Sequence, residues 1–369
     1  MYSKLRNILL TYVPSLLKAS ILCKANFLYN FLEIKPNSCT IMITNRCNLR
    51  CVMCKQWRET PGQELSINNW KRIILDLKHN GIRSIHFSGG EPLLRKDLIE
   101  LVRFSSQNGL VVGATSNGTL LTRVMLAELV DAGLRSIALS MDALGAKYEI
   151  IRGMPNAFAQ LMAAVEAVSS MKKNKKIDAY INFTLMKDTM KDLKMVKTFA
   201  DNACLPLAIC LLDKNSFLFN LEKNADSLWI REKDDFLALQ EALAFLAREK
   251  IKNPKSLIIN FSAIDFVEPY FKNPRQAQVP CVSSQNRVII DTFGGLLGGC
   301  MSMGRFGNIN EKGFDELSAS QEYRIAKKNM FYKKCHGCSC GYLFNLRLFL
   351  PSVFKNIVAK RRYMINAQG

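Results

Sequence analysis

Residues 40 to 215 repeat one pattern: a short, almost wholly apolar run followed by a segment with apolar residues at helical spacing. The first run is Ile41 to Ile43. The helix after it is expected to begin after Ser66, whose hydroxyl can cap it, and to stop at Gly81. Near-continuous apolar strands alternating with helices are typical of a parallel sheet covered by helices. The sequence therefore predicts an α/β fold.

Six strand-helix units account for this region. The later strands are expected at residues 85–87, 110–114, 136–141, 180–186 and 207–212, with helices near 97–109, 157–172 and 189–203 and one more that ends at Gly133. Functional sites in such folds lie at the carboxyl ends of the strands. The stretches that follow each predicted strand are therefore the first places to look for chemistry.

Three cysteines with the spacing CxxxCxxC, namely Cys47, Cys51 and Cys54, directly follow the first predicted strand. Three thiolates on one loop can hold three irons of a four-iron, four-sulfur cluster and leave the fourth iron without a protein ligand. A structural zinc site needs four ligands, and the nearest fourth cysteine, Cys39, lies on the other side of the strand. Taken alone, the triplet is equally compatible with a stray thiol cluster.

A second motif, Gly89-Gly90-Glu91-Pro92, stands at the end of the second predicted strand. Glycines there let the backbone approach a ligand closely, and the carboxylate can accept a hydrogen bond from a ligand ammonium. Further short motifs follow in order, at Thr115-Ser116-Asn117-Gly118, Ser140-Met141-Asp142 and Arg152-Gly153. With these motifs in this order, the chain resembles the radical S-adenosylmethionine (SAM) superfamily over roughly residues 40 to 215.

The resemblance implies a partial (β/α)6 TIM-like barrel, a [4Fe-4S] cluster and bound SAM. In that family an electron from the cluster cleaves SAM to methionine and a 5'-deoxyadenosyl radical. The implied cluster ligands are Cys47, Cys51 and Cys54, and the implied SAM contacts are Gly89, Gly90, Glu91 and Pro92 for the amino group, Ser140 and Arg152 for the carboxylate, and Asn117 and Asp142 for ribose or methionine. One departure is Met53, where many members have an aromatic residue.

A second cysteine group, Cys281, Cys300, Cys335 and Cys338, lies in the last third of the chain. Four thiolates leave no vacancy, and the group resembles the auxiliary-cluster extension of SPASM and Twitch radical SAM enzymes. The resemblance implies one auxiliary [4Fe-4S] cluster, with Cys340 as an alternative ligand or a spare thiol. A structural zinc ion is the alternative, because zinc also accepts four thiolates.

The composition places the chain in a reducing compartment. Its 12 cysteines gather in tight groups within an enzyme-sized chain of 369 residues, which favours metal binding in the cytosol over disulfides. The formal charge of +20 is spread along the chain, and no RNA-recognition signature accompanies it, so a nucleic-acid partner is not favoured. An anionic membrane surface or an acidic substrate would also be attracted.

Both terminal segments are candidates for peripheral membrane contact. Residues 1–38 read as amphipathic helices that either cap the barrel or lie in a membrane interface, and residues 346–369 are apolar and basic. Between them we expect the radical SAM core at 39–215, a helical linker or substrate region at 216–275, and the auxiliary-cluster domain at 276–345. The protein is thus expected to be cytoplasmic, either free or associated with a membrane surface.

The predicted function is abstraction of a substrate hydrogen atom, followed by oxidation or cross-linking if the auxiliary cluster accepts an electron. Without electron removal, epimerisation or rearrangement would follow. The substrate is expected to be a sugar-like or lipid-linked small molecule, or a peptide. About forty residues precede the core, too few for a winged-helix peptide-recognition domain, which favours the small molecule. The electron donor is expected to resemble flavodoxin or ferredoxin. A non-catalytic iron-sulfur or zinc scaffold is the alternative from another class.

Overall fold

The computed structural model describes residues 35–58, 62–174, 176–213, 225–277, 281, 283–301, 303–339 and 363. The predicted amino-terminal helices, Cys340 and almost all of the basic carboxy-terminal segment lie outside these residues. Within the described part of the chain, no helix combines the length and the apolar character that crossing a bilayer requires. The predicted membrane contacts of the two ends stay predictions.

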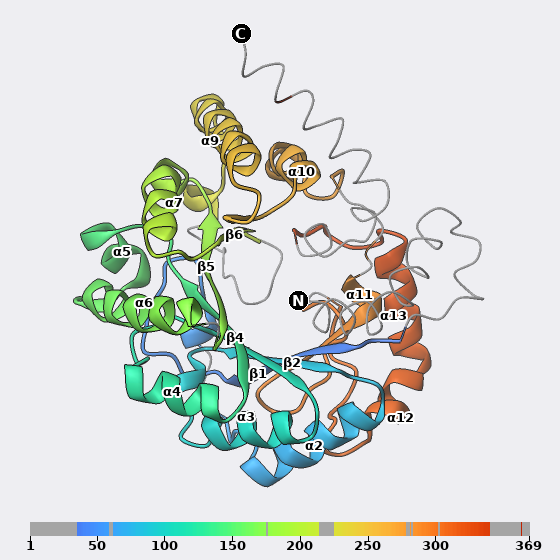
Figure 1. Ribbon diagram of the computed structural model, residues 1–369. Coiled ribbons are helices and arrows are strands. Elements are labelled where there is room, and N and C mark those ends of the chain that lie inside the picture. The colour runs from blue at the N-terminus through green and yellow to red at the C-terminus, as the bar shows by residue number, and fades with distance from the viewer. Residues whose placement is uncertain are drawn as a thin grey trace.

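One eight-stranded sheet, in the order β7-β6-β5-β4-β3-β2-β1-β8, forms the centre of the molecule (Figure 1). All neighbouring strands are parallel. The strands are β1 (Ser38–Thr44), β2 (Ser84–Gly89), β3 (Val111–Ser116), β4 (Leu134–Ser140), β5 (Asp178–Leu185), β6 (Leu207–Leu211), β7 (Leu257–Ile258) and β8 (Arg287–Ile290). The six strands predicted from the sequence are confirmed, and β7 and β8 extend the sheet at its two edges.

Helices cover the outer, convex side of this curved sheet (Figure 1). The helices of the predicted core are α2 (Ile67–His79), α3 (Leu98–Gln107), α4 (Arg123–Asp131), α5 (Gly145–Arg152), α6 (Ala157–Lys173) and α7 (Leu193–Asn202). After them come α8 (Ala225–Leu228), α9 (Lys233–Lys252), α10 (Phe261–Lys272), α11 (Ser283–Asn286), α12 (Phe314–Ala319) and α13 (Gln321–Phe331). The Ser66 side chain accepts from the backbone N–H of Asn69, so the predicted cap is confirmed.

The two faces of the sheet differ in polarity. On the outer face, strand residues such as Ile85, Ile137 and Phe183 are buried in one apolar core with the helices. On the inner face, the alternate residues are polar and only partly buried on several strands, among them His86, Ser88, Thr115, Ser136, Ser140, Tyr180, Asn182, Thr184 and Cys210. Closed TIM barrels fill their interior with bulky apolar side chains, so this inner face differs from a packed core.

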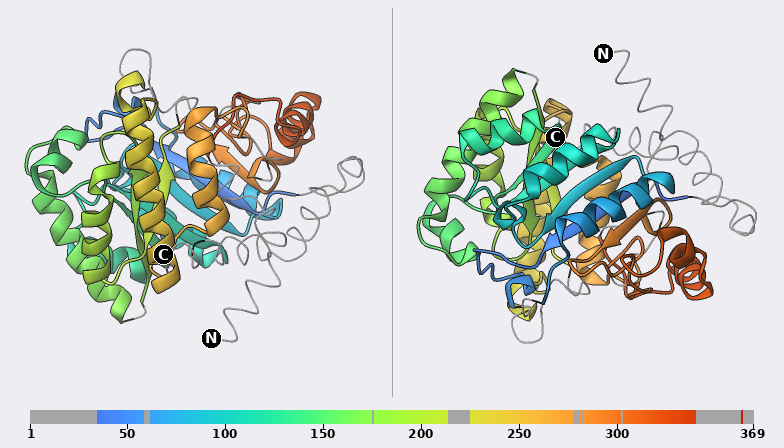
Figure 2. Two further views of the ribbon diagram at one scale, coloured as in Figure 1. Left: turned by 90° about the horizontal axis from the view of Figure 1, so that it is seen from above. Right: turned by 90° about the horizontal axis from the view of Figure 1, so that it is seen from below.

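The segment predicted as a separate auxiliary domain shares the central sheet. Strand β8 pairs in parallel with β1, with Ser38 opposite Arg287 and Ile41 opposite Ile290. After β8 the chain turns back, because Ile290 forms an antiparallel bridge with Leu296. Two views of the molecule place this carboxy-terminal part at one edge of the sheet, beside β1 (Figure 2). The sequence did not indicate this pairing.

Candidate functional site

The three cysteines of the CxxxCxxC motif lie on the loop after β1, and each sulfur accepts a hydrogen bond. The Cys47 sulfur accepts from the backbone N–H of Leu49 at 3.4 Å, and the Cys54 sulfur accepts from that of Gln56 at 3.4 Å. The Cys51 sulfur accepts from Nη1 of Arg152 at 3.7 Å. Hydrogen bonds to a thiolate stabilise its charged form. Taken by themselves, these hydrogen bonds favour the thiolate form of all three cysteines.

Burial and mutual repulsion act in the opposite direction. Burial, and then the charges of Cys51, Glu91 and Cys54, raise the pKa of Cys47 to about 12, against the bond from Leu49. Burial and the nearby Cys51 likewise raise the pKa of Cys54. Three sulfurs this close together become thiolates readily only when a group of positive charge sits between them.

The Gly89-Gly90-Glu91-Pro92 turn packs directly against the beginning of the cysteine loop. The backbone N–H of Gly90 donates to the carbonyl oxygen of Thr44 at 2.7 Å, and that of Glu91 donates to the carbonyl oxygen of Arg46 at 2.8 Å. A Cβ on Gly89 would lie 2.3 Å from the Thr44 oxygen, and one on Gly90 would lie 2.2 Å from the Arg46 oxygen. The sequence interpretation linked these glycines to a ligand; in the structure, both let the turn approach this loop.

Glu91 is fully buried and holds the ends of two strands together. Its carboxylate accepts from the backbone N–H of Leu93 at 3.1 Å, from the Ser116 hydroxyl at 2.9 Å and from the backbone N–H of Asn117 at 2.7 Å. Burial raises the pKa of Glu91 to about 7, and these three hydrogen bonds oppose the shift. The carboxylate therefore already fixes the turn, and its predicted contact with an ammonium remains a prediction.

Arg152 is a buried basic residue that contacts the loop. It is 8% exposed, and its Nη2 lies 2.5 Å from Oδ2 of Asp142, which is completely buried at the end of β4. Burial lowers the pKa of Arg152, but the charges of Asp142 and Cys51 outweigh burial and raise it. Its Nε is buried without a hydrogen-bond partner among the described residues. A buried donor of this kind is the feature expected where a ligand carboxylate binds.

The end of α5 is joined to the cysteine loop by backbone hydrogen bonds. The N–H of Arg50 donates to the carbonyl oxygen of Arg152 at 2.9 Å, and the N–H of Val52 donates to that of Ile151 at 3.0 Å. Gly153 follows with φ +65°, and a Cβ there would lie 2.5 Å from the Arg50 oxygen. The Arg152-Gly153 motif therefore positions both the guanidinium and the loop.

Asn117 joins the end of β3 to the same loop. Its Nδ2 donates to Oδ1 of Asn48 at 2.9 Å, and its Oδ1 accepts from the Thr119 hydroxyl at 2.6 Å. Sequence reasoning passed over Asn48 and Thr119, although Asn48 lies between the first two cysteines. Ser140 is partly exposed at the carboxyl end of β4, two residues before Asp142. The structure thus brings all the predicted SAM contacts to one end of the sheet.

These residues fit a [4Fe-4S] cluster better than a single metal ion. Within the described residues, no three histidine, cysteine, aspartate or glutamate side chains are placed to hold one ion. In a cluster each thiolate binds its own iron, so the sulfurs do not have to meet at one point. The hydrogen-bonded loop sulfurs and the buried Arg152 supply the donors and the charge that such a group requires.

Three of the four cysteines of the carboxy-terminal group, Cys281, Cys300 and Cys335, lie near the short helix α11. Cys281 precedes it, and the charge of Cys335 contributes to raising the pKa of Cys281, after burial, so these two sulfurs are neighbours. A Cβ on Gly299, next to Cys300, would lie 2.7 Å from the carbonyl oxygen of Ser283 on α11. The structure does not place Cys338 as directly. The assignment of the four as ligands remains a prediction.

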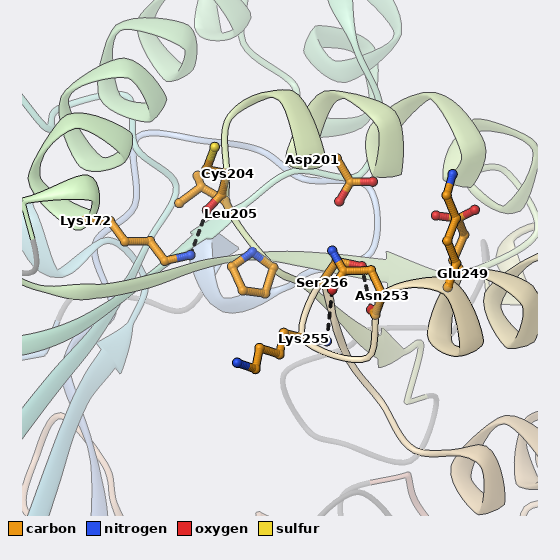
Figure 3. Close-up of a pocket in the computed structure, with 10 residues that line it drawn as sticks. Lys172, Asp201, Cys204, Leu205, Glu249, Asn253, Lys255 and Ser256 are labelled. Atoms are coloured by element: carbon orange, nitrogen blue, oxygen red, sulfur yellow. Dashed lines mark hydrogen bonds between the residues drawn. The ribbon is translucent and has the colours of Figure 1, made fainter. Parts of the chain in front are cut away.

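A cavity of about 530 Å³ lies at the opposite end of the strands, before β6 and β7 (Figure 3). None of the predicted site residues lines it. Helices α6, α7 and α9 all end there, and Lys172 donates to the carbonyl oxygen of Cys204 at 2.7 Å. Lysines are favourable at helix carboxyl ends. The positions of Lys172 and Lys252 at this cavity therefore have a structural explanation.

Comparison with known proteins shows what the core of the chain resembles. The family model described as the radical SAM superfamily matches residues 41–200. A PqqA peptide cyclase of Rhodopseudomonas palustris is 42% identical over 109 residues, which are 29% of this chain and 29% of that protein. The chain thus spans less than a third of that relative.

Two further comparisons extend beyond the core. The tungsten-containing aldehyde ferredoxin oxidoreductase cofactor-modifying protein of Pyrococcus furiosus is 25% identical over 333 residues, covering 80% of this chain and 85% of that protein. The structure of Streptococcus suis SuiB bound to its precursor peptide SuiA matches with a TM-score of 0.64 at 15% identity, covering 85% of this chain and 74% of that one. At this identity the structural match shows a shared fold.

Proposed function

Because the radical SAM superfamily model matches the core of this chain, we propose that the chain is a radical SAM enzyme of the SPASM/Twitch type. We propose further that it abstracts a hydrogen atom from a peptide and oxidises or cross-links that peptide. The observation that carries the proposal is the loop of Cys47, Cys51 and Cys54, whose sulfurs each accept a hydrogen bond and whose ends are held by Glu91's turn and by Arg152. A scaffold that cleaves nothing has no need of this arrangement.

The cofactors of the family are a [4Fe-4S] cluster and SAM, and when bound the cluster supplies the electron that cleaves SAM to methionine and a 5'-deoxyadenosyl radical. We assign the three loop cysteines as cluster ligands. The guanidinium of Arg152 is fixed by Asp142 and can pair with the SAM carboxylate by charge-assisted hydrogen bonds. Ser140 ends β4, two residues before Asp142, and we assign it to the SAM carboxylate as well. The Gly89–Pro92 turn lies at the same end of the sheet, where it can receive the SAM amino group.

The polar inner face of the barrel supports a substrate that forms many hydrogen bonds. Asn182 and Tyr180 of β5 lie on this face, and His86 and Thr115 bond to each other at 2.7 Å across β2 and β3. Peptide groups need hydrogen-bond partners when they leave water, whereas a lipid chain needs apolar walls. Together with the peptide-related names of two similar proteins, this polarity favours a peptide over the lipid-linked molecule expected from the sequence.

The carboxy-terminal cysteines support the oxidative outcome. We assign Cys281, Cys300, Cys335 and Cys338 to an auxiliary [4Fe-4S] cluster. This cluster would accept the electron that the peptide radical gives up after loss of its hydrogen atom, which leaves the peptide oxidised by two electrons in all. Strand β8 joins this segment to the core, because it pairs in parallel with β1 at the edge of the sheet. Epimerisation or rearrangement would apply if no auxiliary cluster forms. We expect the enzyme to work in the reducing cytosol.

The test is anaerobic reconstitution with iron and sulfide, followed by addition of SAM and dithionite. The protein is expected to form 5'-deoxyadenosine, and the Cys54→Ala variant is expected to form none, whereas Cys204→Ala, which removes an exposed cysteine, should behave as the parent. Short peptides encoded near the gene are then added, and a loss of two hydrogens is sought by mass spectrometry. An iron-loaded parent that forms no 5'-deoxyadenosine would contradict the proposed function.

A further inference from the structure

We infer that the outer side of the first cysteine loop is the docking surface for a small acidic protein that carries one electron at a time, of the flavodoxin or ferredoxin kind. This loop surface consists of Arg50, Val52, Lys55, Trp57 and Arg58. The inference rests on the proposed function, because the cluster there must be reduced from outside before SAM can be cleaved.

The loop surface brings the ligand cysteines close to solvent. Val52 stands between Cys51 and Cys54 and is 43% exposed, although both of its neighbours in the chain are buried. Ile150 of α5 is 72% exposed, and the backbone N–H of Val52 donates to the carbonyl oxygen of Ile151, the next residue. Val52, which lies within the cysteine motif, and Ile150, on the helix end bonded to it, are therefore two exposed apolar side chains at the loop surface.

Positive charge surrounds these apolar side chains. Residues 46–58 contain Arg46, Arg50, Lys55 and Arg58 and no acid. Arg46 pairs with Glu64 at 3.4 Å, whereas Arg50, Lys55 and Arg58 form no ion pair with any residue that the structure describes. Glu59, the next residue in the chain, lies outside the described part. An apolar centre with a charged rim is the usual composition of a protein interface.

The guanidinium groups of the loop surface are held in place before any partner arrives. The indole of Trp57 stacks with both arginines, since the Arg50 guanidinium lies 5.1 Å and the Arg58 guanidinium 4.8 Å from its ring centroid. Arg50 also donates from Nη1 to the carbonyl oxygens of Cys47 at 2.8 Å and Leu49 at 2.9 Å. Fixed charges lose little conformational freedom on binding, which favours a specific complex.

The positive charges of the loop surface have a role beyond neutralising the negative charge of the cluster. Arg152 already lies on the buried side of the loop, with its Nη1 bonded to the Cys51 sulfur. Arg58 is exposed and stacks on Trp57 rather than reaching a cysteine. Charges placed outward steer an oppositely charged protein toward its site and raise the rate of association. In the complex, the reduced carrier gives up one electron to the iron-sulfur group and is itself oxidised by one electron, with no atom transferred.

The experiment uses the reconstituted protein and a flavodoxin, with the dissociation constant measured anaerobically at low and high salt. The Lys55→Glu/Arg58→Glu variant is expected to bind about tenfold more weakly or worse, and the parent's affinity should fall as salt rises. The control Arg123→Glu/Lys255→Glu reverses two exposed charges on other parts of the surface and should bind as the parent does. Dithionite-driven SAM cleavage should be the same in all three proteins.

Equal affinity of the parent and the Lys55→Glu/Arg58→Glu variant for flavodoxin would overturn the inference. An equal loss of affinity in the control variant would also overturn it, because the net charge of the protein alone would then explain binding. If the reversed variant takes up less iron, the Lys55→Gln/Arg58→Gln variant replaces it, with an expected loss of about threefold. A parent that binds flavodoxin but cleaves no SAM with dithionite would contradict the proposed function and leave the docking surface standing.

Discussion

Arg152 donates from Nη1 to the sulfur of Cys51 at 3.7 Å, although the two residues are 101 positions apart in the chain. The other end of the guanidinium, Nη2, lies 2.5 Å from Asp142. One buried cation therefore connects a carboxylate at the end of β4 with the loop after β1. The charge of Arg152 is therefore part of the cysteine site. A substitution of Asp142 tests this connection without changing a proposed ligand of iron.

Asp142→Asn should lower the free energy of unfolding by about 3–5 kcal/mol, because it leaves Arg152 as an uncompensated buried charge. Asp142 also accepts from the backbone N–H of Thr184 at 2.7 Å, and asparagine can keep that bond. Urea unfolding of the anaerobic protein measures the change. Glu316→Gln, which removes an exposed ion pair with Lys312, is the control and should have no measurable effect. A result for Asp142→Asn equal to the control would refute this account of the pair.

Gly90→Ala should disrupt the contact between the GGEP turn and the cysteine loop. Its Cβ would lie 2.2 Å from the carbonyl oxygen of Arg46, and backbone must move to relieve that contact. Gly109→Ala is the matched control, since Gly109 has φ +79° but no atom within 4 Å of an added Cβ, so only backbone strain of about 1–2 kcal/mol is expected. Iron uptake after reconstitution should fall in Gly90→Ala and remain normal in Gly109→Ala. Normal uptake in both would show that the turn does not shape the loop.

His86 should make the stability of the protein depend on pH. Burial, and secondly the charge of Arg287, lower the pKa of His86 from 6.5 to about 4. The folded state therefore prefers the neutral imidazole, and the stability that this provides is present above pH 6.5 and lost as the pH falls toward 4. The free energy of unfolding, measured at pH 7 and pH 5, should change less in His86→Gln than in the parent. The surface variant His79→Gln should keep the parent's difference; the same difference in all three would exclude His86 as its source.

Asn182→Ala should separate substrate binding from SAM cleavage. Asn182 lies on the inner face of β5, opposite Ala208 of β6, and belongs to the polar wall proposed to hold the peptide. The variant should still form 5'-deoxyadenosine with dithionite but should modify a peptide substrate about tenfold more slowly, because a hydrogen bond to the peptide is lost. Thr198→Ala, on the exposed side of α7, is the control. Unchanged peptide modification would remove this face from the substrate site.

The order of strands and helices in the core followed from local patterns. The predicted apolar runs correspond to strands β1 to β6, and Ser66 caps α2 as predicted from its place in the sequence. Strand β7 has two residues, and β8 is separated from its partner β1 by more than two hundred residues. Such pairings depend on tertiary packing, which a local pattern cannot reveal.

The sequence predicts where the site lies, but it does not predict the contacts that each residue of the site makes. The cysteine spacing and the short motifs indicated which residues meet at the carboxyl ends of the strands. The bond from Asn117 to Asn48 and the ion pair between Arg152 and Asp142 could not be read from the sequence, because they join segments that are distant in the chain. For the same reason, Glu91 could not be predicted to accept three hydrogen bonds within the protein.

The most direct test of the central claim is the iron and sulfide content, with EPR of the reduced state, of the anaerobically reconstituted Cys47→Ala/Cys51→Ala/Cys54→Ala variant beside the parent. We predict about eight irons in the parent and about four in the variant, with loss of SAM cleavage, because the loop and the carboxy-terminal cysteines would each hold one cluster. Loss of essentially all iron would show that the protein holds one cluster, bound by the loop cysteines, and would favour redox-neutral chemistry. An iron content equal to that of the parent would contradict the assignment of the loop cysteines.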